Sequence, residues 1–126
     1  GLEVDALGGA PGVRSARFSG EGATDVTNRA LLLEKLTTVP ADQRSARFRC
    51  VIALARGGEV LAHFSGAVEG VIIQSEQGGG GFGYDPLFVP EGFSETFAEL
   101  SAETKNSLSH RGRALAAMKV WPGWAR

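Results

Sequence analysis

A glycine-rich stretch with two aromatic rings and one carboxylate is the part of the chain best suited to ligand chemistry. It spans residues 78–86 and has the sequence GGGGFGYDP. Glycines allow the backbone to take positive φ angles and to approach a ligand closely. Phe82 and Tyr84 offer flat faces, and Asp85 offers hydrogen-bond acceptors. The combination suits a planar heterocycle, because stacking holds a base and hydrogen bonds to its edge distinguish one base from another.

The glycines alone are equally typical of an ordinary loop that leads into an edge strand. In that interpretation residues 87–89 form the strand, with Pro86 and Pro90 at its two ends. A second cluster about twenty residues downstream favours the ligand site over the ordinary loop.

This second cluster, residues 105–111 (KNSLSHR), places Lys105, His110 and Arg111 at the start of a segment with helical periodicity. A helix N-terminus favours anions, so cations there cost stability unless an acceptor is recruited. Free N–H groups with cations nearby are suited to a phosphate or to the carbonyl edge of a base.

With several motifs in the family's order, the sequence resembles the inosine triphosphate pyrophosphatases. Members of this family hydrolyse deaminated purine nucleoside triphosphates. Several long motifs in one order are far more specific than a single glycine fingerprint, and the resemblance runs from Gly1 to about Ala117. The matching segments are residues 1–20 (GLEVDALGGAPGVRSARFSG), 44–54 (RSARFRCVIAL), 80–88 (GGFGYDPLF), 96–100 (TFAEL) and 105–115 (KNSLSHRGRAL).

The resemblance implies that one group of residues binds the substrate. An aromatic ring stacks on the purine, the rest of its loop shapes the pocket, and the downstream cations meet the base edge. Hypoxanthine and xanthine carry a carbonyl at C6 where adenine carries an amine, so donors at this edge select deaminated purines. The residues concerned are Phe82 as the stacking ring, with Gly83, Tyr84, Asp85, Lys105, His110 and Arg111.

The resemblance also implies the reaction, which is Mg²⁺-assisted attack of water between the α- and β-phosphates. The family's general base, a metal-binding Glu and a phosphate-binding motif lie upstream of the segment that matches Gly1. We therefore expect no catalytic residue and no metal ligand in residues 1–126, a single domain truncated relative to the family. The isolated chain should be a poor enzyme unless an upstream segment, another chain or the Glu3 and Asp5 pair supplies the carboxylates.

Ser15 and Arg17 are candidates for phosphate contacts, with Arg14 beside them, although solvated arginines are equally ordinary. Two other functions remain open. A binding module would retain affinity for deaminated purines without hydrolysis. A structural protein would use the cleft wall as a dimer interface and would neither bind nor hydrolyse the nucleotide. The sequence does not indicate which of ITP, dITP and XTP is the preferred substrate.

The amino-acid composition restricts the classes of binding partner. A net charge of −1 and a pI near 6.1 argue against nucleic acid or an anionic membrane as the partner. The single cysteine excludes an intramolecular disulfide. Because no apolar run approaches the roughly 20 residues that span a bilayer, the cytoplasm is the expected compartment. The expected partners are a purine nucleoside triphosphate and, from the resemblance, a second copy in a homodimer.

The expected fold class is α/β: a curved mixed sheet with an antiparallel hairpin and flanking helices, one part of a two-lobed molecule. Alternating residues predict strands at 46–55 and 59–67, joined by a turn at Gly57 and Gly58. Shorter strands are expected at 2–6 and 69–73. Pro122 should end a C-terminal helix that begins near Leu108.

Residues 25–36 predict the central helix, with Asp25 as its N-cap. Val26, Ala30 and Leu33 should form one apolar stripe on it, with Leu32 and Leu36 beside the stripe. Asn28 is expected to be a packing or capping group of this helix.

Overall fold

The computed structural model describes residues 1–108 and 110–119 of the chain. Its strands are β1 (Leu2–Val4), β2 (Ser45–Arg56), β3 (Glu59–Ile72) and β4 (Phe88–Pro90). They form one sheet in the order β1-β2-β3-β4. The α/β class is confirmed, but all pairings among the described residues are antiparallel, so the mixed pairing that we expected is not found there.

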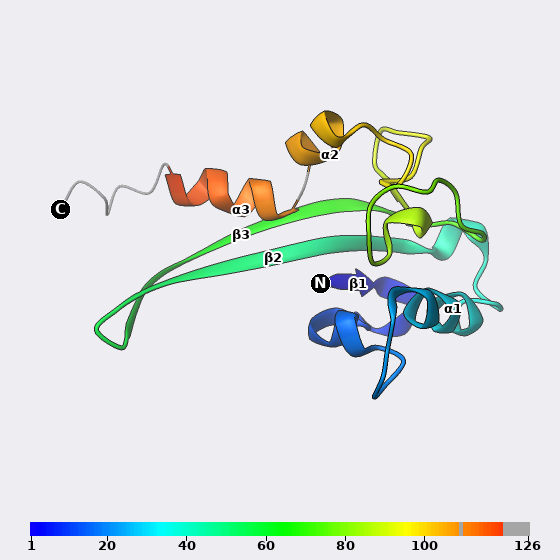
Figure 1. Ribbon diagram of the computed structural model, residues 1–126, viewed down its shortest axis with the longest axis horizontal. Coiled ribbons are helices and arrows are strands. Elements are labelled where there is room, and N and C mark those ends of the chain that lie inside the picture. The colour runs from blue at the N-terminus through cyan, green and yellow to red at the C-terminus, as the bar shows by residue number, and fades with distance from the viewer. Residues whose placement is uncertain (109, 120–126) are drawn as a thin grey trace.

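The β2–β3 hairpin is the longest feature and forms an arm that extends away from the rest of the molecule (Figure 1). The predicted turn is confirmed, since Gly57 and Gly58 have φ angles of 60° and 82°, which suit a tight hairpin turn. The separate strand expected at 69–73 is not separate. It is the end of β3, which continues from Glu59 to Ile72, because residues 69–71 pair with the start of β2 and residues 70–72 pair with β4.

The core lies on one face of the sheet. Aromatic rings meet there, with the centroid of Phe48 4.7 Å from that of Phe88 and 5.8 Å from that of Phe97. The opposite face carries charged side chains such as Arg47 and Arg49. The remaining core residues, all buried, are Leu2, Val4, Leu32, Leu36, Ala46, Val68, Ile72, Tyr84 and Leu87.

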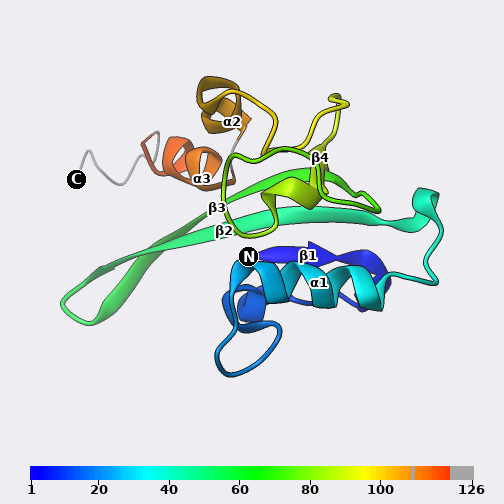
Figure 2. The same cartoon turned by 45° about the vertical axis from the view of Figure 1, so that its right-hand side comes forward.

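Helix α1 (Asp25–Lys35) lies beside β1, whereas α2 (Ala102–Leu108) and α3 (His110–Lys119) lie on the β3 side of the sheet (Figures 1 and 2). No helix in the described ranges is long and apolar enough to cross a membrane. Four 3₁₀ helices link these elements: η1 (Asp5–Leu7), η2 (Gly12–Arg17), η3 (Ala41–Gln43) and η4 (Asp85–Leu87). The strand expected to reach residue 6 therefore ends at Val4.

Two predictions about α1 are wrong. Its N-cap is Thr24, not Asp25, because Thr24 and Thr27 form a reciprocal capping box. The predicted stripe is wrong at Val26, which is 64% exposed, and at Ala30, which is also exposed, whereas Leu33 packs against the core. Leu32 and Leu36, expected beside the stripe, are fully buried, and the buried face also includes a polar side chain, Asn28.

Asn28 packs as expected and ties α1 to the end of η2. Its Oδ1 accepts from the backbone N–H and the hydroxyl of Ser19, at 2.9 and 2.8 Å. Its Nδ2 donates to the carbonyls of Ser15 and Ala16, at 3.3 and 3.1 Å. These bonds satisfy a side chain that is 2% exposed.

Candidate functional site

The loop of residues 78–85 is folded tightly over its own carboxylate. Gly81 has φ of 74°, and a Cβ at this position would lie 2.3 Å from Oδ2 of Asp85. The loop is also anchored from outside, because Gly80 N–H donates to Ala98 O at 3.2 Å and Thr96 Oγ1 donates to Gln77 O at 2.8 Å. The backbone geometry therefore brings Asp85 beneath the loop and leaves no room for a side chain at residue 81.

Asp85 is the centre of this loop. Its side chain is 7% exposed, and its Oδ2 accepts from Phe82 N–H at 3.1 Å. The same oxygen accepts from the ammonium of Lys105, twenty residues further along the chain. Because a buried carboxylate needs such partners, the Asp85–Lys105 ion pair fixes the position of the lysine relative to the loop.

Phe82 presents the aromatic surface of the site. The residue is 74% exposed, and the glycines before it, residues 78–81, are exposed too. The Nζ of Lys105 lies 4.7 Å from the centroid of this ring, within cation–π range. Lysine has three donors, so the ammonium can bind Asp85 and still donate to a ligand beside the ring. A flat ring next to a cationic donor can stack a heterocycle and bond to an acceptor on its edge.

Tyr84 does not provide a second stacking face, contrary to the expectation from its position in the loop. Its side chain is buried, and its hydroxyl donates to the carbonyl of Ser15 at 2.7 Å. Burial, and to a smaller extent the charge of Asp25, raises the pKa of Tyr84 to about 12. The phenol is therefore neutral and joins the loop to η2.

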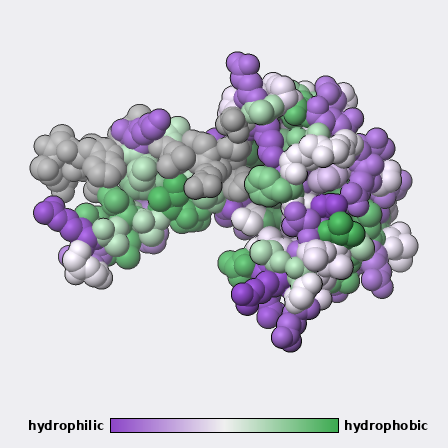
Figure 3. Space-filling view, viewed as in Figure 1, coloured by the Kyte–Doolittle hydropathy of each residue, from purple (hydrophilic) through white to green (hydrophobic). Residues whose placement is uncertain are grey.

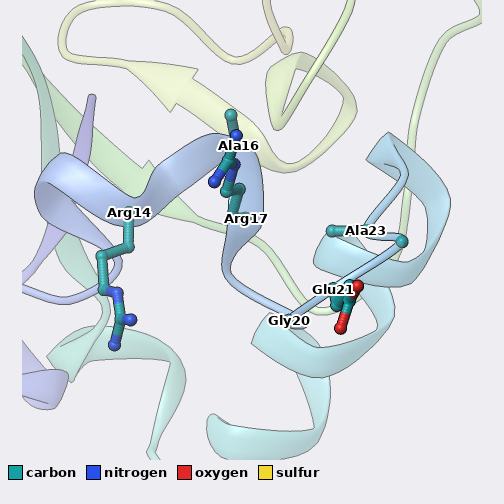
Figure 4. A pocket seen from close by; sticks show the side chains of 7 residues that line it. Arg14, Ala16, Arg17, Gly20, Glu21 and Ala23 are labelled. Atoms are coloured by element: carbon teal, nitrogen blue, oxygen red, sulfur yellow. The ribbon is translucent and has the colours of Figure 1, made fainter.

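An open hollow of about 740 Å³ lies next to η2 (Figure 4). Arg14 and Arg17 line it from η2, and Glu21 lines it from the loop that leads to α1. Neither guanidinium has a hydrogen-bond or ion-pair partner among the described residues. The hollow is thus lined by free cationic donors suited to an anion.

Ser15 uses its hydroxyl within the protein, and the phosphate contact predicted for this residue stays a prediction. Its Oγ donates to Gly12 O at 2.6 Å and accepts from Leu2 N–H at 2.9 Å. The hydroxyl proton is therefore already used within the protein. The same residue's carbonyl receives the Tyr84 hydroxyl, so η2 and the Phe82 loop are directly connected.

The second sequence cluster is divided between two helices. Lys105 lies in the last turn of α2, not at a helix N-terminus, because Ser101 caps α2 by accepting from Thr104 N–H at 3.2 Å. His110 is the first residue of α3, and Arg111 follows it. The side chains of His110 and Arg111 lie outside the described part of the structure, so the base-edge role predicted for both stays a prediction. The helix expected from Leu108 is confirmed as α3, whereas Pro122 lies outside the described residues.

Glu3 and Asp5, the candidates for substitute catalytic carboxylates, form ion pairs with arginines. Arg47 donates to both oxygens of Asp5 at 3.0 Å, and Arg49 donates to Glu3 at 3.1 Å. The hydrogen bonds from Arg47, and then from Ser45, hold the pKa of Asp5 below its usual value. Such a carboxylate is a weak base, because its charge is already neutralised.

The described residues do not fit the Mg²⁺ that the family resemblance implies. Within residues 1–108 and 110–119, no group of three or more His, Cys, Asp and Glu side chains could hold a metal ion. Glu3, Asp5 and Glu69, the acidic residues beside Arg47 and Arg49, are already paired with these arginines.

Asp25 and Arg29 also contact the loop, although the sequence gives no sign of these contacts. Both lie on the side of α1 that faces Gly83, and their side chains bond to its backbone. Asp25 was interpreted as a cap, and Arg29 carried no signal, because contacts more than 50 residues apart in sequence leave no local pattern.

The fold and the site define an α/β protein in which an exposed ring, a buried Asp–Lys pair and an arginine-lined hollow lie on connected segments. The chain belongs to the Ham1 family, whose family model matches residues 1–121. This membership confirms the resemblance that the sequence motifs indicate.

Relatives with high identity are named dITP/XTP pyrophosphatase. The protein from Geobacter sulfurreducens is 56% identical over 124 residues, which are 98% of this chain and 62% of that protein. The Escherichia coli protein is 51% identical over 119 residues, which are 91% of this chain and 59% of the relative. The chain therefore spans about three fifths of the length of these relatives.

Solved structures agree with the fold. The Staphylococcus aureus Ham1 protein matches with a TM-score of 0.91 at 39% identity, covering 100% of this chain and 65% of that one. A protein from Mycobacterium abscessus, described as a nucleoside-triphosphatase / dITP/XTP pyrophosphatase, matches with a TM-score of 0.83 at 48% identity. That match covers 96% of this chain and 64% of the other.

Proposed function

We propose that this chain carries the base-recognition half of a nucleoside triphosphate pyrophosphatase that hydrolyses deaminated purine nucleotides such as ITP, dITP and XTP. The products are the nucleoside monophosphate and pyrophosphate. One observation supports the proposal most directly: the exposed ring of Phe82 lies beside a lysine held in place by Asp85. The names of the relatives support the same substrate class.

The base would stack on Phe82, and its C6 carbonyl would accept from Lys105. Adenine presents an amine at this position, so two donors would face each other and one would stay unpaired. Such a mismatch at a buried site costs about 10⁴-fold in selectivity. His110 and Arg111 are proposed as further contacts to the base edge, while Gly83, Tyr84 and Asp85 shape the pocket.

The triphosphate would lie toward η2. Arg17, with Arg14 beside it, lines a hollow on the segment that Tyr84 connects to the base loop. Guanidinium groups without protein partners are available for phosphate oxygens. Ser15 positions Tyr84 through its carbonyl and stays proposed as a phosphate contact beside Arg17.

We also propose that the protein acts as a cytoplasmic homodimer, without nucleic acid or membrane as a partner. Apolar side chains occur on the hairpin arm (Figure 3), where Val51, Val60 and Leu61 are 57%, 52% and 46% exposed. Exposed apolar groups on a projecting arm favour contact with another protein surface. Sedimentation of the chain at several concentrations tests this part, with a single monomer species as the contrary result.

Pyrophosphate release from ITP and from ATP, measured at several enzyme concentrations with Mg²⁺, tests the activity. Turnover selective for ITP and proportional to enzyme supports hydrolysis by this chain. No release, together with thermal stabilisation by ITP but not by ATP, supports base recognition alone. An absence of both effects refutes the proposal and favours a structural role.

A further inference from the structure

The backbone of Gly83 is held on both sides by charged side chains from one helix. Asp25 Oδ2 accepts from Gly83 N–H at 3.0 Å. Arg29 Nη1 donates to Gly83 O at 2.8 Å. Asp25 and Arg29 are one helical turn apart on α1, so they project from the same face of the helix. We name this pair the Gly83 clamp.

The clamp is itself fixed by the residues around it. Arg29 is only 13% exposed, and its Nε lies 3.1 Å from Oε1 of Glu76, just before the glycine run. That contact is an ion pair without the geometry of a directed hydrogen bond. Asp25 is positioned by the capping box of Thr24, which fixes the start of α1. The helix therefore holds the loop at residue 76 and again at residue 83.

The position of Gly83 matters because it lies between the two aromatic residues of the loop. Tyr84 is anchored in the core, whereas the ring of Phe82 is mostly exposed. The backbone of Phe82 is held at its N–H by Asp85 and, one residue later, by the clamp. A ring with few packing contacts of its own depends on such backbone bonds for its orientation.

We propose that Asp25 and Arg29 are positioning residues for purine recognition. They fix the Phe82 ring beside Lys105 before the nucleotide arrives, so that binding need not order the loop. Preorganisation of this kind increases affinity by lowering the entropy lost on binding, and it sharpens the geometry of hydrogen bonds to the base edge. The inference rests on the proposed function, because it assumes that the purine binds at Phe82.

The test compares ITP and ATP affinities, measured by calorimetry, for the chain and its variants Asp25→Ala and Arg29→Ala. Both variants should bind ITP at least about tenfold more weakly, with a smaller change for ATP, so the selectivity ratio falls. Asp25→Asn retains an oxygen that can accept from Gly83 N–H, so it should restore most of the selectivity. Glu34→Ala and Lys35→Ala are matched controls, because they remove exposed charges from the same helix without touching the loop.

Amide exchange of Gly83, followed by NMR, reports the clamp independently of the nucleotide. Its N–H should exchange slowly in the unmodified chain and in Asp25→Asn, and at least about tenfold faster in Asp25→Ala. If Asp25→Ala does not fold, Arg29→Ala and Asp25→Asn still provide the comparison.

Two results would overturn the inference. One is an unchanged ITP/ATP ratio in Asp25→Ala and Arg29→Ala, even with lower stability, because a merely structural role weakens both nucleotides equally. The other is a Gly83 amide that stays protected without Asp25. If the unmodified chain itself does not prefer ITP, the proposed function fails, and the inference fails with it whatever the Gly83 amide does.

Discussion

Replacing Gly81 by alanine tests whether the backbone of the glycine loop sets the position of Asp85. Gly81 has φ of 74°, and the added Cβ would lie 2.3 Å from Asp85 Oδ2. The left-handed conformation costs an alanine about 1–2 kcal/mol. Displacing the carboxylate also weakens its charged hydrogen bonds to Phe82 N–H and Lys105, each worth about 1.5–3 kcal/mol. We expect Gly81→Ala to lower the free energy of unfolding by about 3 kcal/mol.

Two neighbouring glycines provide matched controls. Gly79 has an ordinary φ and open space around it, so Gly79→Ala should change the free energy of unfolding by less than about 0.5 kcal/mol. Gly83 has φ of 60° and open space, so Gly83→Ala isolates the backbone cost of about 1–2 kcal/mol. The difference between Gly81→Ala and Gly83→Ala therefore measures the contact with Asp85.

Urea denaturation followed by circular dichroism gives the three free energies of unfolding, and ITP titration of each folded variant gives the affinity. Gly81→Ala should also bind ITP more weakly, because Asp85 positions Lys105 beside Phe82. A stability loss in Gly81→Ala equal to that in Gly79→Ala would refute this account of the loop. A loss equal to that in Gly83→Ala would show that Asp85 is not displaced.

Three further predictions address single residues. Tyr84 is the one tyrosine of the chain, so absorbance at high pH should report its pKa of about 12 directly. The folded protein holds this proton more tightly than the unfolded chain does, so the contribution of Tyr84 to the free energy of unfolding should be fully present below pH ~10 and be lost as the pH rises from about 10 to 12. The variant Tyr84→Phe should not show this loss. A titration midpoint near pH ~10 would contradict the burial of the phenol. Asn28→Ala should lower the free energy of unfolding by about 2 kcal/mol in urea, because it leaves buried partners without bonds, and a loss below 0.5 kcal/mol would argue against its structural role. Lys105→Ala should bring ITP and ATP affinities closer together in calorimetric titrations, and unchanged selectivity would reject the lysine as the base-edge donor.

Local sequence patterns predicted the secondary-structure elements that are specified by their own residues. The alternation of residues 46–55 and 59–67, with two glycines between them, specifies a hairpin whatever surrounds it. The glycine loop was likewise recognisable from its composition. The separate strand expected at 69–73 was wrong because residues 69–71 pair with residues 45–47 of β2, a long-range partner that leaves no local pattern.

Long-range contacts determine the features of the candidate site that local sequence patterns did not predict. Tyr84 lies two residues after Phe82 in the same loop, yet its hydroxyl donates to Ser15, 69 residues away, and its ring is buried in the core. The Ser15 hydroxyl accepts from the start of β1, which no local pattern indicates. The buried face of α1 includes a polar residue, Asn28, beside Leu32 and Leu36. Apolar periodicity cannot reveal a buried side chain whose hydrogen bonds are all satisfied.

The central claim is that this chain recognises a deaminated purine through Phe82 and Lys105. Calorimetric titration of the purified 126-residue chain with ITP and with ATP tests it most directly. ITP should bind at least about a hundredfold more tightly than ATP. Equal affinities, or a preference for ATP, would contradict it.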